Sequence, residues 1–137
     1  MTEEFKQQLE DNKRRIVHLL NNSLLDEDGY PTTDALEIIE LWSYYDPTGW
    51  FEFIKKLWNM VEWGWEVTRQ PHPNRPEVAV DRYYISTGGW SGNEDVIRAM
   101  MSNKMLWSFT WVSSRRGGHY VFEVSSLGEA HDQARDF

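Results

Sequence analysis

The chain has no cysteine among its 137 residues. Disulfide bonds and thiolate metal sites are therefore excluded, and nothing in the composition points to an oxidising compartment. No run of residues is long and apolar enough to span a bilayer, and residues 1–15 hold no apolar segment typical of a signal peptide. We therefore expect a soluble, cytoplasmic protein with no membrane partner.

Signatures of metal binding and catalysis are also missing. The histidines show neither H-x-H nor H-E-x-x-H spacing and stand at His18, His72, His119 and His131. No nucleophile elbow surrounds a serine, so a hydrolase pairing His119 with Ser86, Ser113 or Ser114 is the weaker hypothesis. We predict no metal, no cofactor and no catalytic residue, and a binding role is favoured over an enzymatic one.

Aromatic residues and negative charge are plentiful instead. Aromatic residues make up 15% of the chain, and all eight tryptophans lie between Trp42 and Trp111. These indoles either fill a core or form a binding face. The net charge is −8, and residues 1–63 hold 13 acidic and 6 basic side chains against 6 and 7 in residues 64–126. General binding to duplex DNA is therefore disfavoured, whereas the second half can accept a small anion.

Helical periodicity predicts three helices in residues 1–63. Thr2 caps the first, which ends near residues 21–22, Thr33 caps the second, and Asp46 with Pro47 begins the third. The apolar stripe of the third helix consists of Trp50, Ile54, Leu57, Trp58 and Val61. Gly64 ends this helical half.

Alternating apolar residues predict four strands in residues 64–126, at residues 65–70, 78–86, 105–113 and 119–125. A helix is predicted at residues 93–102, and the proline-rich residues 71–77 are expected to form an irregular surface loop. The fold class is therefore α+β: three helices packed on a mainly antiparallel four-stranded sheet with one inserted helix, which permits one parallel crossover. Residues 1–137 form a single domain that ends in a polar tail, residues 127–137.

The rest of the chain is organised around residues 80–124, which include a glycine-rich turn between a strand and a helix. Ser91 and Glu94 fit a capping box at the helix start. A strand, a glycine turn and a helix start together expose backbone N–H groups that can hold a phosphate or carboxylate. The motif is neither a Walker loop nor a Rossmann fingerprint, so a tight turn that only reverses the chain is the alternative.

Two further features favour ligand binding. Arg115 and Arg116, before a second glycine pair, supply cations for phosphate contacts. Trp90, in the middle of the first turn, is placed to stack on a nucleobase. The predicted ligand site consists of Ser86, Thr87, Gly88, Gly89, Trp90, Ser91, Asn93, Arg115, Arg116 and His119. Whether these residues converge depends on the strand order.

The runs STGGWSGNE, LWSFTW and SSRRGGHYVFEV resemble a family of small uncharacterised proteins from tailed bacteriophages and prophages. The resemblance covers residues 83–124 and extends more weakly over residues 50–65. It implies a phage accessory protein that acts against host defences in the bacterial cytoplasm.

Two functions are consistent with these features. The first is a non-catalytic protein that sequesters a small phosphorylated ligand, such as a nucleotide or a cyclic oligonucleotide signal. The alternative is an acidic inhibitor of a host defence complex, of the anti-CRISPR or DNA-mimic type, which would use Asp34, Glu37 and Glu40. A homo-oligomer is favoured, because a small domain rich in aromatics has little interior in which to bury them.

Overall fold

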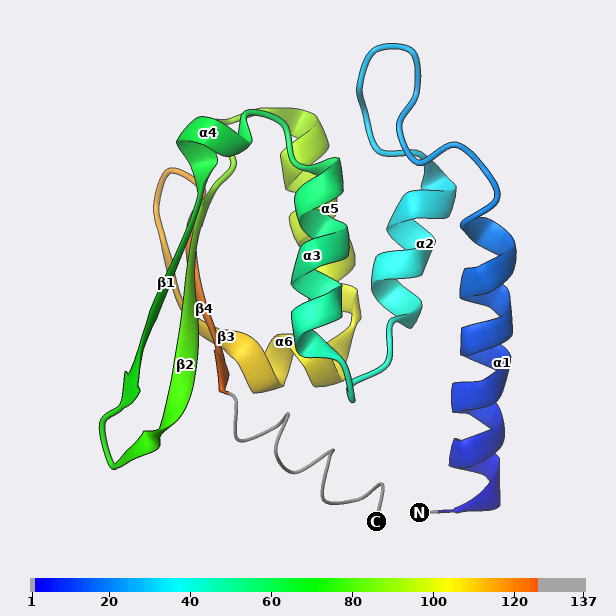
Figure 1. Ribbon diagram of the computed structural model, residues 1–137. Coiled ribbons are helices and arrows are strands. Elements are labelled where there is room, and N and C mark those ends of the chain that lie inside the picture. The colour runs from blue at the N-terminus through cyan, green and yellow to red at the C-terminus, as the bar shows by residue number, and fades with distance from the viewer. Residues whose placement is uncertain (1, 126–137) are drawn as a thin grey trace.

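The computed structural model describes residues 2–125, so the predicted tail at residues 127–137 lies outside the described residues. The α+β class is confirmed (Figure 1). The elements are α1 (Glu3–Leu19), α2 (Thr33–Leu41), α3 (Pro47–Leu57), α4 (Val61–Gly64), β1 (Trp65–His72), β2 (Arg75–Ser86), α5 (Ser91–Ser102), α6 (Lys104–Thr110), β3 (Trp111–Arg115) and β4 (His119–Ser125).

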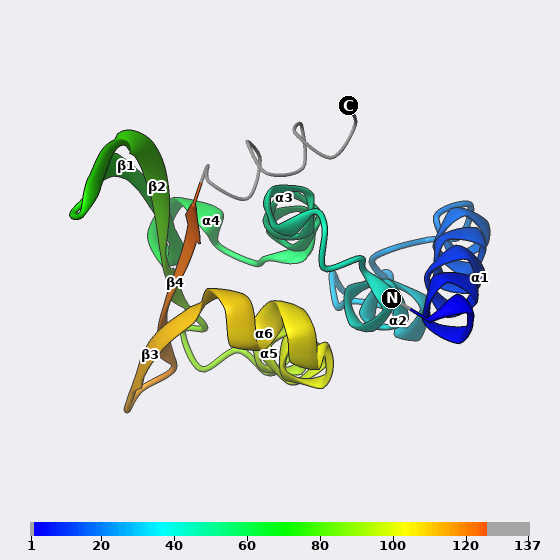
Figure 2. The ribbon, with the colours of Figure 1, turned by 90° about the horizontal axis from the view of Figure 1, so that it is seen from below.

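One four-stranded sheet forms the first layer, with strand order β1-β2-β4-β3 and antiparallel pairing throughout. The parallel crossover that the inserted helix permitted is not used. The segment α5–α6 instead leads to the edge strand β3, and a hairpin returns the chain to the centre of the sheet. Figure 2 shows α3, α5 and α6 on one side of the sheet, then α2, and then α1 as the outermost helix.

The core lies between α3 and the sheet. Phe51 stacks on Tyr83 with ring centroids 4.2 Å apart and also packs on Phe122 at 5.3 Å. The predicted stripe of α3 is buried from Trp50 to Leu57, but the helix ends there. Trp58 is the C-cap, only 5% exposed, and Val61 belongs to α4, so the stripe was predicted too long.

Helix α5 is fastened at both ends by a buried asparagine. At its start, the Asn93 amide donates to the carbonyls of Asn59 (3.1 Å) and Thr87 (3.2 Å) and accepts from the Asn59 N–H (2.9 Å). At its end, Asn103 donates to the carbonyls of Ile39 and Trp42, both at 3.0 Å. Because these carbonyls belong to different segments, the two side chains join the sheet, the α3–α4 connection and α2 to one helix.

The strand predicted at residues 105–113 is wrong over most of its length, because these residues form α6 before β3 begins. Asn103 caps α6, because its side-chain oxygen accepts a hydrogen bond from the Leu106 N–H at 3.3 Å. Leu106 and Thr110, four residues apart, are buried, and Phe109 is exposed. The aromatic alternation was thus compatible with a helix whose start depends on the buried asparagine.

Two other predicted boundaries are also corrected. The proline-rich residues 71–77 do not form an irregular loop, because β1 and β2 continue into them and reverse at residues 73–74. Pro71 is tolerated because β1 is an edge strand. The cap of α2 is Thr32, which accepts from the Ala35 N–H at 3.2 Å, and Thr33 is the first helical residue.

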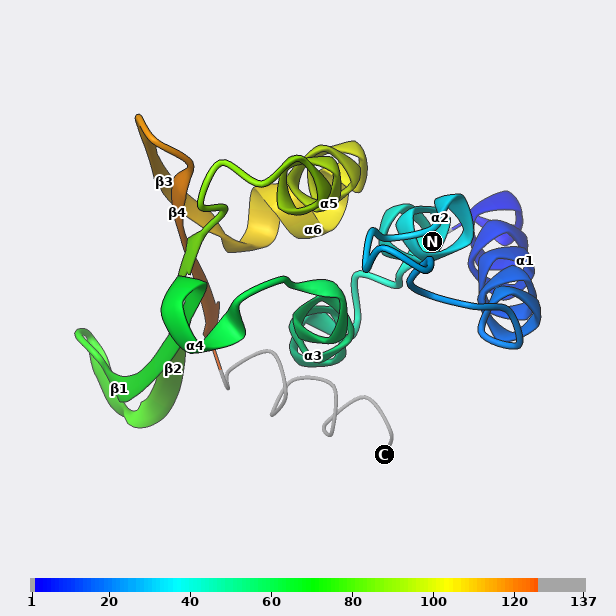
Figure 3. The same ribbon diagram turned by 90° about the horizontal axis from the view of Figure 1, so that it is seen from above.

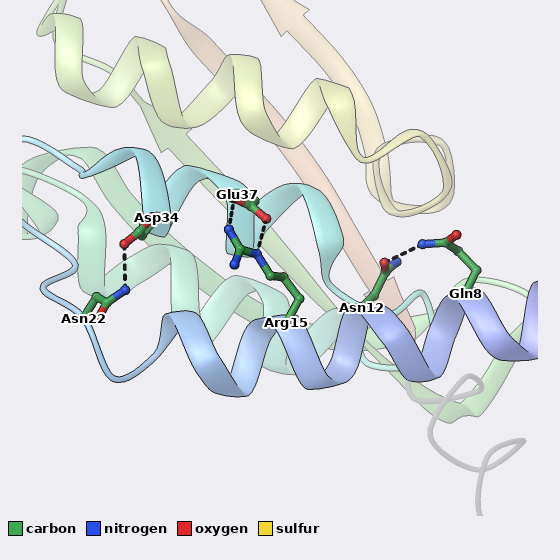
Figure 4. A network of polar contacts seen from close by, with 6 residues as sticks. All are labelled: Gln8, Asn12, Arg15, Asn22, Asp34 and Glu37. Atoms are coloured by element: carbon green, nitrogen blue, oxygen red, sulfur yellow. Dashed lines mark hydrogen bonds and ion pairs between the residues drawn. The ribbon is translucent and has the colours of Figure 1, made fainter.

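Polar contacts attach α1 to α2 (Figure 4). Arg15 donates two hydrogen bonds to Glu37, at 2.8 and 3.2 Å, and Asn22 donates to Asp34 at 2.9 Å. The hydrogen bond from Arg15 holds the pKa of Glu37 below its usual value. Of the acids assigned to a partner-binding surface, Glu37 therefore pairs with α1 and Asp34 with the segment that follows it, whereas Glu40 stays exposed.

Replacing Asn93 with aspartate tests the fastening of α5. A carboxylate would face two carbonyl oxygens with no N–H to offer, so Asn93→Asp should lower the free energy of unfolding at pH 7 by at least about 2 kcal/mol. The folded-state pKa of the new carboxyl should be raised, so the deficit should shrink as the pH falls and one O–H donor returns. Denaturant unfolding at pH 7 and pH 5 measures both effects. Asn74→Asp, at the exposed β1–β2 turn, is the control and should change stability by less than about 0.5 kcal/mol.

The attachment of α1 should depend on pH. Since the pKa of Glu37 is lowered in the folded state, its pairing with Arg15 stabilises α1 above the ordinary carboxyl pKa and is lost as the pH falls through the lowered value. Amide-exchange protection factors in α1 should therefore decrease as the pH is lowered. Glu37→Gln should show low protection already at pH 7 and a weaker pH dependence, whereas Glu40→Gln should behave as the parent. Equal protection in the parent and Glu37→Gln at pH 7 would contradict the assignment.

Candidate ligand-binding site

The two glycine-rich segments of the sequence meet at one end of the sheet. Ser86, the last residue of β2, is the register partner of His119, the first residue of β4. The Thr87 N–H donates to the Gly118 carbonyl at 3.0 Å. We call residues 86–90 and 115–119 together the paired turns. Seen from above, the segment after β2 passes between α4 and the β3–β4 hairpin (Figure 3).

Only a glycine at position 118 allows the two turns to approach so closely. A Cβ added there would lie 2.2 Å from Thr87 Oγ1, and the residue has a φ of +80°. Gly89, also at positive φ, +74°, has nothing within 4 Å of its hypothetical Cβ. The space beside Gly89 is therefore open, and a ligand can approach the backbone there.

Ser86 and His119 form a polar pair on the sheet face opposite the helices. Their neighbours Ile85 and Tyr120 face the core, so by strand alternation these two side chains point away from it. Ser86 Oγ lies 2.7 Å from His119 Nδ1. Within residues 2–125 no carboxylate is hydrogen-bonded to His119, so the pair lacks the acidic third member of a catalytic triad. It offers a hydroxyl and an imidazole to a ligand.

Cations lie on the other side of His119. Arg115 is its register partner on β3, so Ser86, His119 and Arg115 form one row across three strands. Arg115 and Arg116 are exposed and make no ion pair with any residue in the described part of the chain. Guanidinium groups without a carboxylate partner are suited to bind a phosphate.

Most backbone N–H groups of the first turn are already paired. The Thr87 N–H bonds Gly118, the Gly89 N–H lies 3.3 Å from Thr87 Oγ1, and the Trp90 N–H donates to the Thr87 carbonyl at 3.2 Å. The open cluster of N–H donors expected from the sequence is therefore smaller than predicted. Attraction for an anion would come chiefly from the arginines and from His119.

Three residues of the predicted ligand site make contacts within the fold. The Trp90 ring packs on Tyr30 with centroids 4.6 Å apart and lies against Gly92. Ser91 does not cap α5, because the N-cap position is Trp90, and its hydroxyl lies 3.4 Å from the Tyr30 hydroxyl. Asn93 is 2% exposed, and its amide is engaged by Asn59 and Thr87.

Trp63 lies beside the paired turns, although the ligand site predicted from the sequence does not include it. It lies on α4, it is 61% exposed, and its ring contacts the position of Gly88, whose added Cβ would be 3.2 Å away. The sequence signal was a tryptophan directly before the glycine that ends the helical half. The prediction used only the apolar stripe of the preceding helix, to which this tryptophan does not belong.

A separate groove of about 510 Å³ runs beside α1, away from the paired turns. Its largest apolar side chains are Leu9, Ile16, Val17, Leu41, Trp42 and Tyr45. No residue of the predicted ligand site lines this groove.

Comparison with known proteins supplies no analogy for the site. No protein-family model matches the chain, and no curated protein and no solved structure matches it significantly. Within residues 2–125 no group of three or more His, Cys, Asp or Glu side chains could hold a metal ion. Among the helices of that range, none has both the length and the apolar character needed to cross a lipid bilayer.

Two alanine variants test the close approach of the turns. Gly89→Ala should cost only the left-handed backbone conformation, about 1–2 kcal/mol. Gly118→Ala should cost that amount plus the clash with Thr87, in total about 2–5 kcal/mol. Urea unfolding of the two variants measures the difference. Equal stability would show that the turns separate without penalty and are not a fixed unit.

Proposed function

We propose that this protein binds a small phosphorylated ligand at the paired turns and does not transform it. The observation that carries the proposal is the convergence of the turns, through the bond between the Thr87 N–H and the Gly118 carbonyl. Segments about 30 positions apart in the sequence thereby bring a serine, a histidine and two arginines to one end of the sheet, beside the open backbone at Gly89. No single segment would assemble that set.

The charge distribution supports an anion as the ligand. The net charge of the chain is −8, and among the arginines of residues 2–125 only Arg115 and Arg116 form no ion pair with a carboxylate. A phosphate can take two parallel hydrogen bonds from one guanidinium, and an imidazole and a hydroxyl beside it can add further bonds. Because the arginines are exposed, binding should weaken as the salt concentration rises.

The biological setting of the proposal comes from the resemblance to proteins of tailed bacteriophages. In that setting the ligand would be a nucleotide or cyclic oligonucleotide signal of bacterial defence. Sequestering that signal in the host cytoplasm would suffice to block the defence. A protein-binding inhibitor remains the alternative. That alternative has fewer free carboxylates available than the sequence suggested, because Glu37 is paired with Arg15 and Asp34 accepts a hydrogen bond from Asn22.

The proposal predicts thermal stabilisation by phosphorylated probes. Mononucleotides, dinucleotides and cyclic oligonucleotides should be screened at low salt, because a ligand present at 100 times its dissociation constant stabilises the folded state by about 2.7 kcal/mol. Arg115→Ala/Arg116→Ala should weaken binding by about 10-fold or more. Lys55→Ala/Lys56→Ala, which makes the same change in net charge on the exposed side of α3, should bind as the parent does.

A flat response across the whole panel would contradict the proposal and favour the protein-binding alternative. Equal losses in the two double variants would also contradict it, because they would show a general charge effect and not a site at the paired turns.

A further inference from the structure

Trp63 is the most exposed tryptophan on this sheet end, and its surroundings do not explain that exposure. Its side chain is 61% exposed, although the large apolar area of an indole makes its contact with water more costly in free energy than that of most side chains. Met60, at the N-cap of the same short helix, is 60% exposed. The end of the sheet that carries the paired turns also carries α4 (Figure 1), and the Trp63 side chain on α4 is exposed.

The backbone fixes where this ring stands. Met60 has a left-handed conformation, with φ 65° and ψ 51°, which costs a non-glycine residue free energy. Its carbonyl accepts from the N–H groups of Trp63 at 3.1 Å and Gly64 at 2.9 Å, which closes the turn tightly. An added Cβ at Gly64 would lie 2.5 Å from the Ser86 carbonyl oxygen, so α4 rests directly on the last residue of β2.

The ring and the cations flank the same stretch of chain from opposite sides. In the strand order, α4 and β1 lie on one side of β2, and β4 lies on the other. The Trp63 ring contacts Gly88, while the adjacent Thr87 bonds Gly118 on the hairpin that carries the arginines. A ligand lying across Gly88 and Gly89 would therefore have an aromatic ring on the α4 side and guanidinium groups on the side of the β3–β4 hairpin.

We infer that the ligand carries a nucleobase that stacks on Trp63 while its phosphate lies at Arg115 and His119. This inference rests on the proposed function and adds to it the residue that recognises the base and the place of the phosphate. Trp90, the stacking residue expected from the sequence, is already packed on Tyr30 at 4.6 Å. Trp63 is the tryptophan beside the paired turns with a largely exposed ring.

Comparing AMP with ribose 5-phosphate isolates the contribution of the base, because the two probes share the sugar and the phosphate. Titration calorimetry at low salt should show that the parent binds AMP about 5-fold to 150-fold more tightly than ribose 5-phosphate. Trp63→Leu should lower AMP affinity to that of ribose 5-phosphate and leave the latter unchanged. Trp63→Tyr should restore part of the difference.

Phe109→Leu is the matched control, since Phe109 is 63% exposed on α6 and should affect neither titration. If the parent binds AMP and ribose 5-phosphate equally and Trp63→Leu changes neither, the inference fails while the proposed function stands. If the parent binds neither probe and no compound of the nucleotide panel stabilises it, both fail. Because Trp63 and Phe109 are both exposed, these variants should fold, and a thermal melt of each variant checks this before titration.

Discussion

The hydrogen bonds of the Asn93 amide are the constraint on which the rest of the structure depends. This one buried side chain accepts from the Asn59 N–H and donates to the carbonyls of Asn59 and Thr87. Buried polar groups that lose such partners are costly, so the three segments cannot separate independently. The start of α5, the end of β2 and the chain that enters α4 are thereby held in one arrangement. Asn103 repeats the device at the other end of α5, where it joins α2 to the start of α6.

The candidate site is a consequence of that arrangement. Because Thr87 is held from the inside by Asn93, its N–H faces the β3–β4 hairpin and bonds Gly118. Because Asn59 is held as well, the left-handed turn at Met60 follows at once and places Trp63 against Gly88. The short loop after β2, which Asn93 holds from the core side, is thus surrounded by the polar pair of Ser86 and His119, the two arginines and the exposed indole. A rigid loop of this kind binds a ligand without first having to become ordered.

The sequence predicted the elements better than their endings. Residue patterns identified the helical first half, the antiparallel sheet, the caps at Thr2 and Asp46, and the two glycine segments, since each depends on local chemistry. Local patterns did not single out Asn103 as the start of a new helix, because the carbonyls that hold its side chain belong to residues about 60 positions away. For the same reason Asn93 was assigned to the ligand and Trp90 to a nucleobase. Tyr30, which covers Trp90, belongs to a distant loop.

Whether a phosphorylated ligand lies across the paired turns can be measured by NMR in a titration of the ¹⁵N-labelled protein with AMP. Shift changes should concentrate in the backbone amides of residues 86–90 and 115–119 and in the Trp63 indole N–H. Residues that line the groove beside α1 should not shift. Changes confined to that groove, or no change with AMP or with any other compound of the nucleotide panel, would contradict binding at the paired turns.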